Sequence, residues 1–114
     1  MRAVNREELE PFTTKDGSEI REYLHTAVQS LAEATLAPGQ PTQRHYHRLS
    51  EEIYLLVEGG GTMEIDGEER EVRADDAILI PAGAWHTLVA GDDGARLLCC
   101  CVPPYSHEDT RLVE

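Results

Sequence analysis

Short stretches of alternating or continuous apolar residues follow one another along most of the chain, separated by turn residues. A period of two is typical of strands with one buried face, and a short apolar run is typical of a strand buried on both. Turn signals at intervals of roughly 8–12 residues predict an all-β sandwich or barrel. The predicted strands are residues 30–37, 43–47, 52–57, 62–65, 68–73, 77–80, 86–90 and 95–102.

Turn residues divide these strands. Asp66-Gly67 lies between two strand-like runs and predicts a two-residue hairpin, because both turn positions need a positive φ. The glycine-rich segments 59–61 and 91–94 are predicted to be turns that end the strands before them.

The two ends of the chain carry weaker signals. Asn5 followed by Glu8 resembles a helix N-cap with its reciprocal glutamate, so one helical turn is expected near residues 5–10, before Pro11. The prolines at 103–104 cannot continue a strand normally. The tail is therefore expected to cross the surface or a neighbouring subunit.

Length and charge narrow the class of protein. The 114 residues are enough for one domain, 1–114, and too few for two. The net charge is -12 and Lys15 is the one lysine, so nucleic acid is not an expected partner, because phosphate contacts need clustered basic residues. No apolar stretch approaches the roughly 20 residues that span a bilayer, and the first residues lack the apolar core of a signal peptide. We expect no membrane partner and a cytoplasmic location.

Three adjacent cysteines, Cys99, Cys100 and Cys101, allow two interpretations. They could form a thiol metal or redox site. They could also be small apolar side chains that pack a buried strand, which the flanking apolar residues favour.

The strongest chemical signal is a set of histidines and a carboxylate. His45 and His47 are two residues apart, so on a strand they point the same way. Glu52 follows shortly, and His86 opens a distant strand. A single His-x-His is a weak signal, but three imidazoles and a carboxylate suit divalent Fe, Mn, Ni, Co, Cu or Zn. Four protein ligands on a metal that prefers six leave two positions for water or substrate.

The spacing around these residues resembles the first motif of the cupin family. That motif is Gly, five residues, His-x-His, three or four residues, Glu, six residues, Gly. Here it falls on Gly39, His45, His47, Glu52 and Gly59.

The second cupin motif is Gly, five residues, Pro-x-Gly, two residues, His, three residues, Asn. It falls on Asp75, Pro81, Gly83, His86 and Ala90. Asp75 is a mild departure because Asp tolerates left-handed turn geometry. Ala90 removes an expected structural hydrogen bond but no ligand.

The resemblance covers residues 39–90 and has structural and chemical implications. It implies a double-stranded β-helix, the jelly-roll cupin barrel, often found as a homodimer. It also implies a metal held by His45, His47, Glu52 and His86.

Glu51 competes with Glu52 for the carboxylate position, since the family tolerates either spacing. Counting six residues back from Gly59 selects Glu52. Alternation agrees, because Glu52 shares a strand face with Tyr54 and Leu56 while Glu51 falls on the opposite face.

Tyr54 is the candidate catalytic residue, because it lies two residues from Glu52 on the same face and could donate a proton or a hydrogen bond. The alternative is a core aromatic with a satisfied hydroxyl. Gln43 falls on the side of the two histidines, where it could orient a ligand or act as a structural amide. Trp85 is expected to face away from His86, in packing or a dimer contact.

The remaining candidates are weaker. His25 and His107 are lone histidines expected at the surface, although the tail with His107 could reach the mouth of a site. Arg44 and Arg48 point opposite the ligands on strand geometry, which argues against binding of a substrate carboxylate.

The leading functional hypothesis is a metal-dependent enzyme that acts on a small organic molecule, with oxygenase and isomerase or cyclase chemistry both open. The alternative is a non-catalytic module that binds a metabolite or a metal. An open coordination position beside an acid or base group would favour the enzyme. A closed tetrahedral site in an apolar pocket would favour the binding module.

Overall fold

The computed structural model describes residues 1–112 and is almost entirely β, which confirms the predicted all-β class. Within these residues, no helix has the length and apolar character to cross a bilayer. The elements are η1 Arg6–Glu8, β1 Phe12–Thr13, β2 Glu19–His25, β3 Ser30–Leu36, β4 His45–His47, β5 Glu51–Ile65, β6 Glu68–Arg73, β7 Ala77–Ile80, β8 His86–Val102 and β9 Thr110–Leu112.

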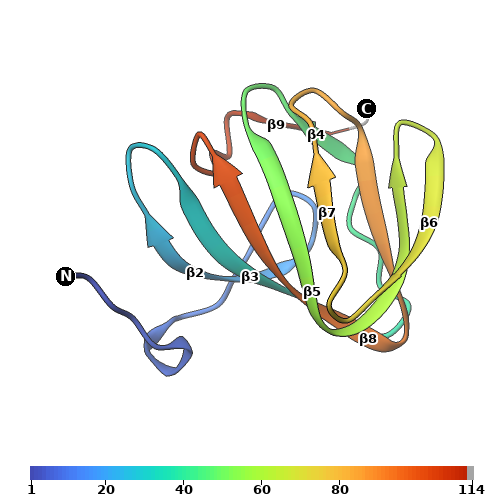
Figure 1. Ribbon diagram of the computed structural model, residues 1–114, viewed down its shortest axis with the longest axis horizontal. Coiled ribbons are helices and arrows are strands. Elements are labelled where there is room, and N and C mark those ends of the chain that lie inside the picture. The colour runs from blue at the N-terminus through green and yellow to red at the C-terminus, as the bar shows by residue number, and fades with distance from the viewer. Residues whose placement is uncertain (113–114) are drawn as a thin grey trace.

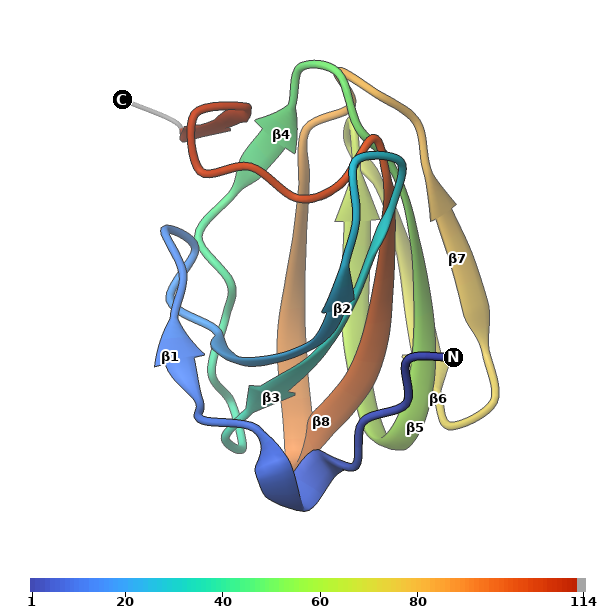
Figure 2. The ribbon, with the colours of Figure 1, turned by 90° about the vertical axis from the view of Figure 1, so that its left-hand side faces the viewer.

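The strands form one curled sheet. Its path runs β1-β2-β3-β8-β4-β9, and β5 pairs with β6, β7 and β8 (Figure 1). The first half of β5 pairs with the second half of β8, and the second half of β5 with the first half of β8. Seen from the side, the sheet curls so that β1 and β4 lie opposite β7 (Figure 2). This curl gives the sheet an inner face on which residues from distant strands meet.

The glycine-rich segments do not end strands, and the prediction of turns there was wrong. β5 continues through 59–61 and β8 continues through 91–94. The ladder between the two strands shifts register between Leu56 and Glu58 and again between Gly59 and Gly61, as β-bulges do. A Cβ on Gly61 would overlap the carbonyl oxygen of Val89. The glycines therefore permit a close approach of backbones within long bent strands.

The strands that sequence reasoning missed, β1, β2 and β9, lie at or next to the two ends of the main strand path. β2 buries none of its residues fully, so its sequence lacks a clear alternation. β9 follows the two prolines, and the tail that was expected to cross the surface folds back to pair with β4. The Asp66-Gly67 hairpin is as predicted, with both residues at positive φ.

Alternation along β5 places the candidate residues on the predicted faces of the strand. Glu52, Tyr54 and Leu56 are buried, whereas Glu51 is exposed. The core behind them is mainly aliphatic, as expected from a chain with few aromatic residues. Its buried members are Ala34, Leu36, Tyr54, Leu56, Met63, Val72, Ile80, Ala84, Leu88, Ala90, Ala95, Leu97 and Cys99.

The N-terminal helical turn is capped as predicted, since Asn5 and Glu8 form a reciprocal capping box. Its Arg6 Nε lies 2.9 Å from Oε2 of Glu33, a fully buried carboxylate on β3. Burial raises the pKa of Glu33, but Arg6 and Arg96 outweigh it and hold the pKa below its ordinary value. This ion pair fixes the N-terminal segment against the outer face of β3.

Candidate metal centre

Three strands bring the predicted ligands together on the inner face of the sheet. β4 carries His45 and His47, β5 carries Glu52, and β8 carries His86. His45 is paired directly with His86 across the β4–β8 ladder. All four side chains are buried. Because β4 and β5 both pair with β8, residues as much as 41 positions apart in the sequence converge.

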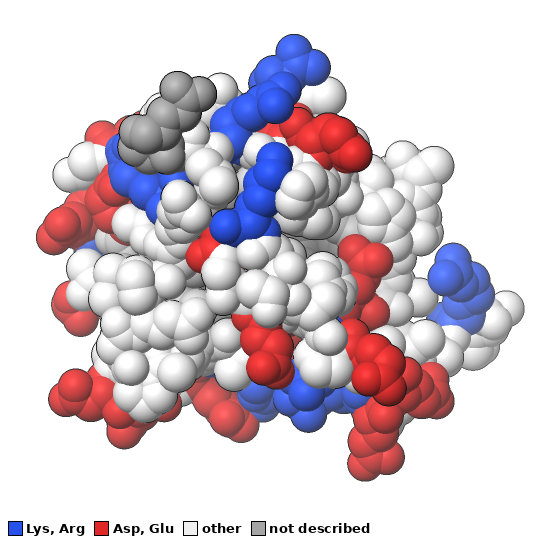
Figure 3. Space-filling view, turned by 180° about the vertical axis from the view of Figure 1, so that it is seen from behind, with Lys and Arg blue, Asp and Glu red and all other residues white. Residues whose placement is uncertain are grey.

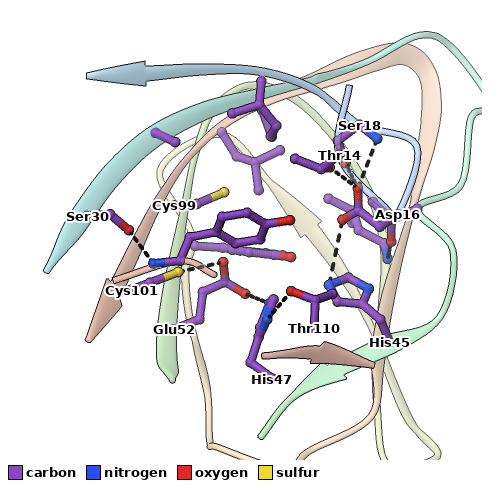
Figure 4. Close-up of a pocket in the computed structure, with 18 of the residues that line it drawn as sticks. Thr14, Asp16, Ser18, Ser30, His45, His47, Glu52, Cys99, Cys101 and Thr110 are labelled. Carbon is purple, nitrogen blue, oxygen red and sulfur yellow. Dashed lines mark hydrogen bonds and ion pairs between the residues drawn. The ribbon is translucent and has the colours of Figure 1, made fainter. Parts of the chain in front are cut away.

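The three histidines are close enough to share one ion, and Glu52 lies beside two of them. The ligand nitrogens of His45, His47 and His86 lie within 4.8 Å of one another. Glu52 Oε1 lies 3.3 Å from His47 Nε2 (Figure 4) and 3.6 Å from His86 Nε2. Glu52 thus borders the three-histidine group on the side of His47 and His86.

Hydrogen bonds fix the tautomer of two imidazoles. His45 Nδ1 lies 2.7 Å from the Gln43 carbonyl oxygen, and His86 Nδ1 lies 2.9 Å from the Ala84 carbonyl oxygen. A carbonyl oxygen only accepts, so both Nδ1 atoms must carry the proton. The Nε2 atoms of these rings then present lone pairs toward the centre of the group.

The third imidazole is fixed by a hydroxyl. His47 Nδ1 lies 3.1 Å from Thr110 Oγ1, and the Thr110 hydroxyl donates its proton to the Ser106 carbonyl oxygen at 2.9 Å. Thr110 must therefore accept from His47 Nδ1–H. Such outer contacts orient histidine ligands in metal sites, and here they turn all three Nε2 lone pairs inward.

The centre of this group fits a divalent cation. Among the described residues, Glu52 Oε1 and His86 Nε2 are buried without a hydrogen-bond partner. A buried carboxylate oxygen that faces imidazole lone pairs is costly unless a cation or a proton lies between them. Three imidazoles and one carboxylate match the donor preference of divalent transition metals.

The pKa values of His45, His47 and Glu52 are consistent with a site for a cation. Burial and the neighbouring His86 lower the pKa of His45 to about 4, so it is neutral at neutral pH. Burial alone would raise the pKa of Glu52, but His47 and His86 lower it to about 2, so it is ionised. Burial lowers the pKa of His47, and the negative charge of Glu52 more than offsets this and raises it above its ordinary value. Positive charge is therefore favoured beside Glu52.

Tyr54 lies at the edge of the group, with its ring centroid 6.1 Å from that of His86. It is buried, and burial together with the charge of Glu52 raises its pKa well above the ordinary value. The phenol therefore keeps its proton and can act as a hydrogen-bond donor, whereas a phenolate base is disfavoured.

The cysteines divide between two faces of β8. Cys99 and Cys101 are buried and line the cavity, whereas Cys100 is half-buried. The Cys101 thiol donates to Glu52 Oε2 at 3.2 Å. Burial raises the pKa of Cys99 and Cys101 far above their ordinary value. Both stay protonated, which favours packing and hydrogen bonding over a thiolate site.

Gln43 is not among the inward-facing residues, and the prediction that placed it there was wrong. It is exposed, because β4 begins only at His45 and the alternation does not extend back to Gln43. Its contribution is the carbonyl oxygen that holds His45. The buried residue before the strand is Thr42.

The other candidates lie outside the group, as expected. Arg44 forms an ion pair with Glu64 at 2.7 Å and lies over the Trp85 ring at 5.3 Å. Trp85 packs against Tyr46, facing away from His86. The lone histidines His25 and His107 are exposed, and so is Arg48.

Two polar residues of the site had no signal in the sequence. Thr110 comes from the C-terminal tail and Asp16 from the loop between β1 and β2. Neither lies near the histidines in sequence, so only the folding of both ends of the chain onto β4 reveals them. With Tyr105, they line the cavity that opens from the histidines toward solvent.

Replacement of Thr110 tests the outer contact. Thr110→Val removes the acceptor for His47 Nδ1–H while keeping the volume, and metal affinity is expected to fall roughly 10–100-fold. Thr110→Ser keeps the hydroxyl and should bind metal nearly as the parent protein does. Competition with a chromogenic chelator measures both. Equal affinity of the Val and Ser variants would show that this contact does not orient the ligand.

The two adjacent glutamates provide a matched pair. Glu52→Gln should lower metal affinity by at least about 10-fold, because it removes the buried carboxylate that lies 3.3 Å from His47 and 3.6 Å from His86. Glu51→Gln should leave metal content unchanged, because Glu51 is exposed. Elemental analysis of both variants checks this, and the reverse pattern would mean that the register of β5 is wrong.

Comparison with known proteins gives consistent matches. The family profile for the cupin domain matches residues 32–101. The chain is 46% identical to the uncharacterized protein MJ1618 of Methanocaldococcus jannaschii over 95% of this chain and 91% of the relative. It is 33% identical to the polyketide synthase protein CurC of Streptomyces cyaneus over 96% of this chain and 77% of the relative. A structure of a Streptomyces PAC13 variant with uridine superposes with a TM-score of 0.85 at 19% identity, over 100% of this chain and 90% of that one. The fold is accordingly the predicted double-stranded β-helix jelly roll.

Proposed function

The chain belongs to the cupin family, and on that premise we propose that it is a metal-dependent enzyme that acts on a small organic molecule. The observation that carries the proposal is the orientation of the three histidines. Each donates Nδ1–H outward, so that three Nε2 lone pairs face one another beside the Glu52 carboxylate, and His45, His47 and Glu52 line one cavity. A protein with no use for a cation would bury this arrangement only at a cost.

In this proposal His45, His47, Glu52 and His86 hold a divalent transition metal, one of Fe, Mn, Ni, Co, Cu or Zn. Such a metal supplies Lewis acidity toward an oxygen of the bound molecule or, for a redox-active ion, reactivity toward dioxygen. Oxygenase and isomerase or cyclase chemistry both follow from these capacities.

The protein side chains have separate roles around the metal ligands. Tyr54 donates a hydrogen bond, or a proton, to an oxygen of the bound molecule, since its raised pKa keeps it protonated. Apolar residues of the cavity wall, such as Ile20, Leu36 and Leu88, exclude water from the polar end. The relatives support a small organic substrate, since CurC is a polyketide synthase protein and PAC13 was solved with uridine.

The second candidate function is a non-catalytic binding module. The mainly apolar wall of the cavity favours it, because Tyr54 is one of few acid or base groups near the histidines. The metal should first be identified in protein purified without an affinity tag. The same protein should then be screened for oxygen consumption and, by mass spectrometry, for product formation. Product formation that requires the metal supports the enzyme, whereas release of every bound compound unchanged favours the module.

A homodimer is part of the proposal. Ile53 and Leu79 are partners across the β5–β7 ladder and are both exposed on the outer face, and Leu55 is exposed two residues from Ile53. Exposed apolar residues on adjacent strands are typical of a subunit interface. Sedimentation analysis of the purified protein tests this, and a monomer at micromolar concentration would contradict it.

Nucleic acid is not a proposed partner. On the face shown in Figure 3, basic side chains of the described residues are separated by acidic and uncharged surface. Such a surface offers no continuous basic track for phosphates. A cytoplasmic location stays a prediction from the sequence.

A further inference from the structure

Asp16 is an acidic side chain of the site beyond the four predicted ligands. It lies in the loop between β1 and β2 and lines the same cavity. Its Oδ2 lies 3.6 Å from His45 Nε2, and its side chain is 13% exposed. In Figure 4 Asp16 lies beside His45, while Glu52 lies beside His47.

The other carboxylate oxygen of Asp16 is fully engaged. Oδ1 accepts hydrogen bonds from Thr14 Oγ1 at 2.7 Å, Ser18 Oγ at 2.6 Å and the Ser18 backbone N–H at 2.9 Å. The backbone carbonyl of Asp16 accepts from the Gln43 N–H at 2.7 Å, which ties the loop to the segment before β4. The carboxylate is therefore held in one orientation, with Oδ2 directed at the histidines.

The contact between Oδ2 and His45 joins two acceptors. His45 donates Nδ1–H to Gln43, so its Nε2 presents a lone pair, as does the carboxylate oxygen. Two hydrogen-bond acceptors so close together are unfavourable unless a hydrogen-bond donor or a cation interacts with both. Like Glu52, Asp16 lies beside the group of three histidines, but it borders the group on the side of His45 and lines the cavity there. A molecule bound in the cavity against the histidines would therefore lie next to Oδ2.

The charge of the cavity wall restricts what that molecule can be. Asp16, Glu22 and Glu52 line the cavity, and no lysine or arginine does so among the described residues. Arg44 is drawn away to Glu64 and Trp85. An anionic group that entered beside Asp16 would be repelled by its carboxylate and would meet no cationic side chain, so only the proposed metal, whose charge Glu52 offsets in part, would attract it.

We propose that Asp16 is a specificity-determining residue, whose Oδ2 accepts a hydrogen bond from a hydroxyl of an uncharged ligand bound against the histidines. Phenols and alcohols fit this site, and carboxylates and phosphates are disfavoured. The inference rests on the proposed function in that it places a small organic molecule at this centre. Apolar residues such as Ile20 and Ala34 enclose the body of the ligand.

The test compares phenol with benzoate, which share a ring but differ in donor capacity and charge. Both are titrated into the metal-containing protein by calorimetry. Asp16→Asn keeps an acceptor for Thr14 and Ser18 and places an amide N–H where Oδ2 was. Phenol should bind the parent protein more tightly than benzoate. In the variant, phenol affinity should fall about 10-fold, because a charge-assisted hydrogen bond is lost, and benzoate affinity should rise.

Glu22→Gln is the matched control. Glu22 also lines the cavity, but its carboxylate pairs with His25 at 3.2 Å. The control removes a negative charge from the cavity wall but leaves the acceptor beside His45 in place, so it should change the ratio of phenol to benzoate affinity much less than Asp16→Asn does. The inference is overturned if Asp16→Asn leaves the ratio unchanged, if Glu22→Gln changes it equally, or if the parent protein does not bind phenol.

Metal content, measured on the same samples, separates this inference from the proposed function. Parent protein that binds no metal contradicts the proposed function. The ratio of phenol to benzoate affinity tests separately whether Asp16 determines specificity. Loss of metal from Asp16→Asn would also overturn the inference, because it would make Asp16 a ligand.

Discussion

His47→Ala is expected to remove stoichiometric metal from the protein while leaving the fold intact. The change deletes one of three inward-facing nitrogens and leaves Glu52 Oε1 without its nearest imidazole, which lies at 3.3 Å. Loss of an outer contact alone costs roughly 10–100-fold in metal affinity, so loss of a ligand should exceed about 100-fold. Elemental analysis of protein purified without a tag measures the effect, and circular dichroism verifies the fold.

His25→Ala is the control for this variant. His25 is an exposed histidine at the end of β2, paired only with Glu22, so its loss should not change metal content. Full retention of metal by His47→Ala, or equal loss from His25→Ala, would refute the assignment of ligands.

Gly61→Ala is expected to destabilise the protein by more than about 4 kcal/mol or to prevent folding. A Cβ at this position would overlap the carbonyl oxygen of Val89, which belongs to the backbone of the neighbouring strand and cannot rotate away. Gly61 is paired with Ala90 in the β5–β8 ladder, so relief would require these two strands to separate. Urea denaturation followed by circular dichroism measures the free energy of unfolding.

Gly91→Ala is a control from the same region. The nearest atom to a Cβ on Gly91 is the Gly60 carbonyl oxygen at 3.6 Å, an ordinary contact. This variant should stay within about 1 kcal/mol of the parent protein. Similar stability of the two alanine variants would show that the strands tolerate side chains at their crossing.

The glycines explain why the sequence predicted the class of fold but not its long strands. A Gly-Gly-Gly run indicates a turn when only local preferences are considered. Here the requirement for glycine comes from the backbones of β6 and β8, which lie next to residues 60 and 61. Such contacts between distant segments leave no periodic pattern in the local sequence.

The candidate site, too, could be predicted only in part from the sequence. Alternation correctly placed Glu52 and Tyr54 inward and Glu51 outward, because these residues lie within a regular strand. It failed for Gln43, which precedes the short strand β4. Thr110 and Asp16 reach the histidines through loop and tail conformations, so no spacing rule pointed to them. The motif spacing pointed to the proposed ligands and strand alternation to their faces, whereas the surroundings of the ligands depend on tertiary structure.

A crystal structure of protein purified without a tag, with anomalous scattering data collected at the absorption edge of its metal, tests the central claim most directly. We predict one strong anomalous peak per chain, at about 2.0–2.2 Å from Nε2 of His45, His47 and His86 and in contact with the Glu52 carboxylate. A metal peak bound elsewhere, or histidine side chains without a peak in protein that contains stoichiometric metal, would contradict it.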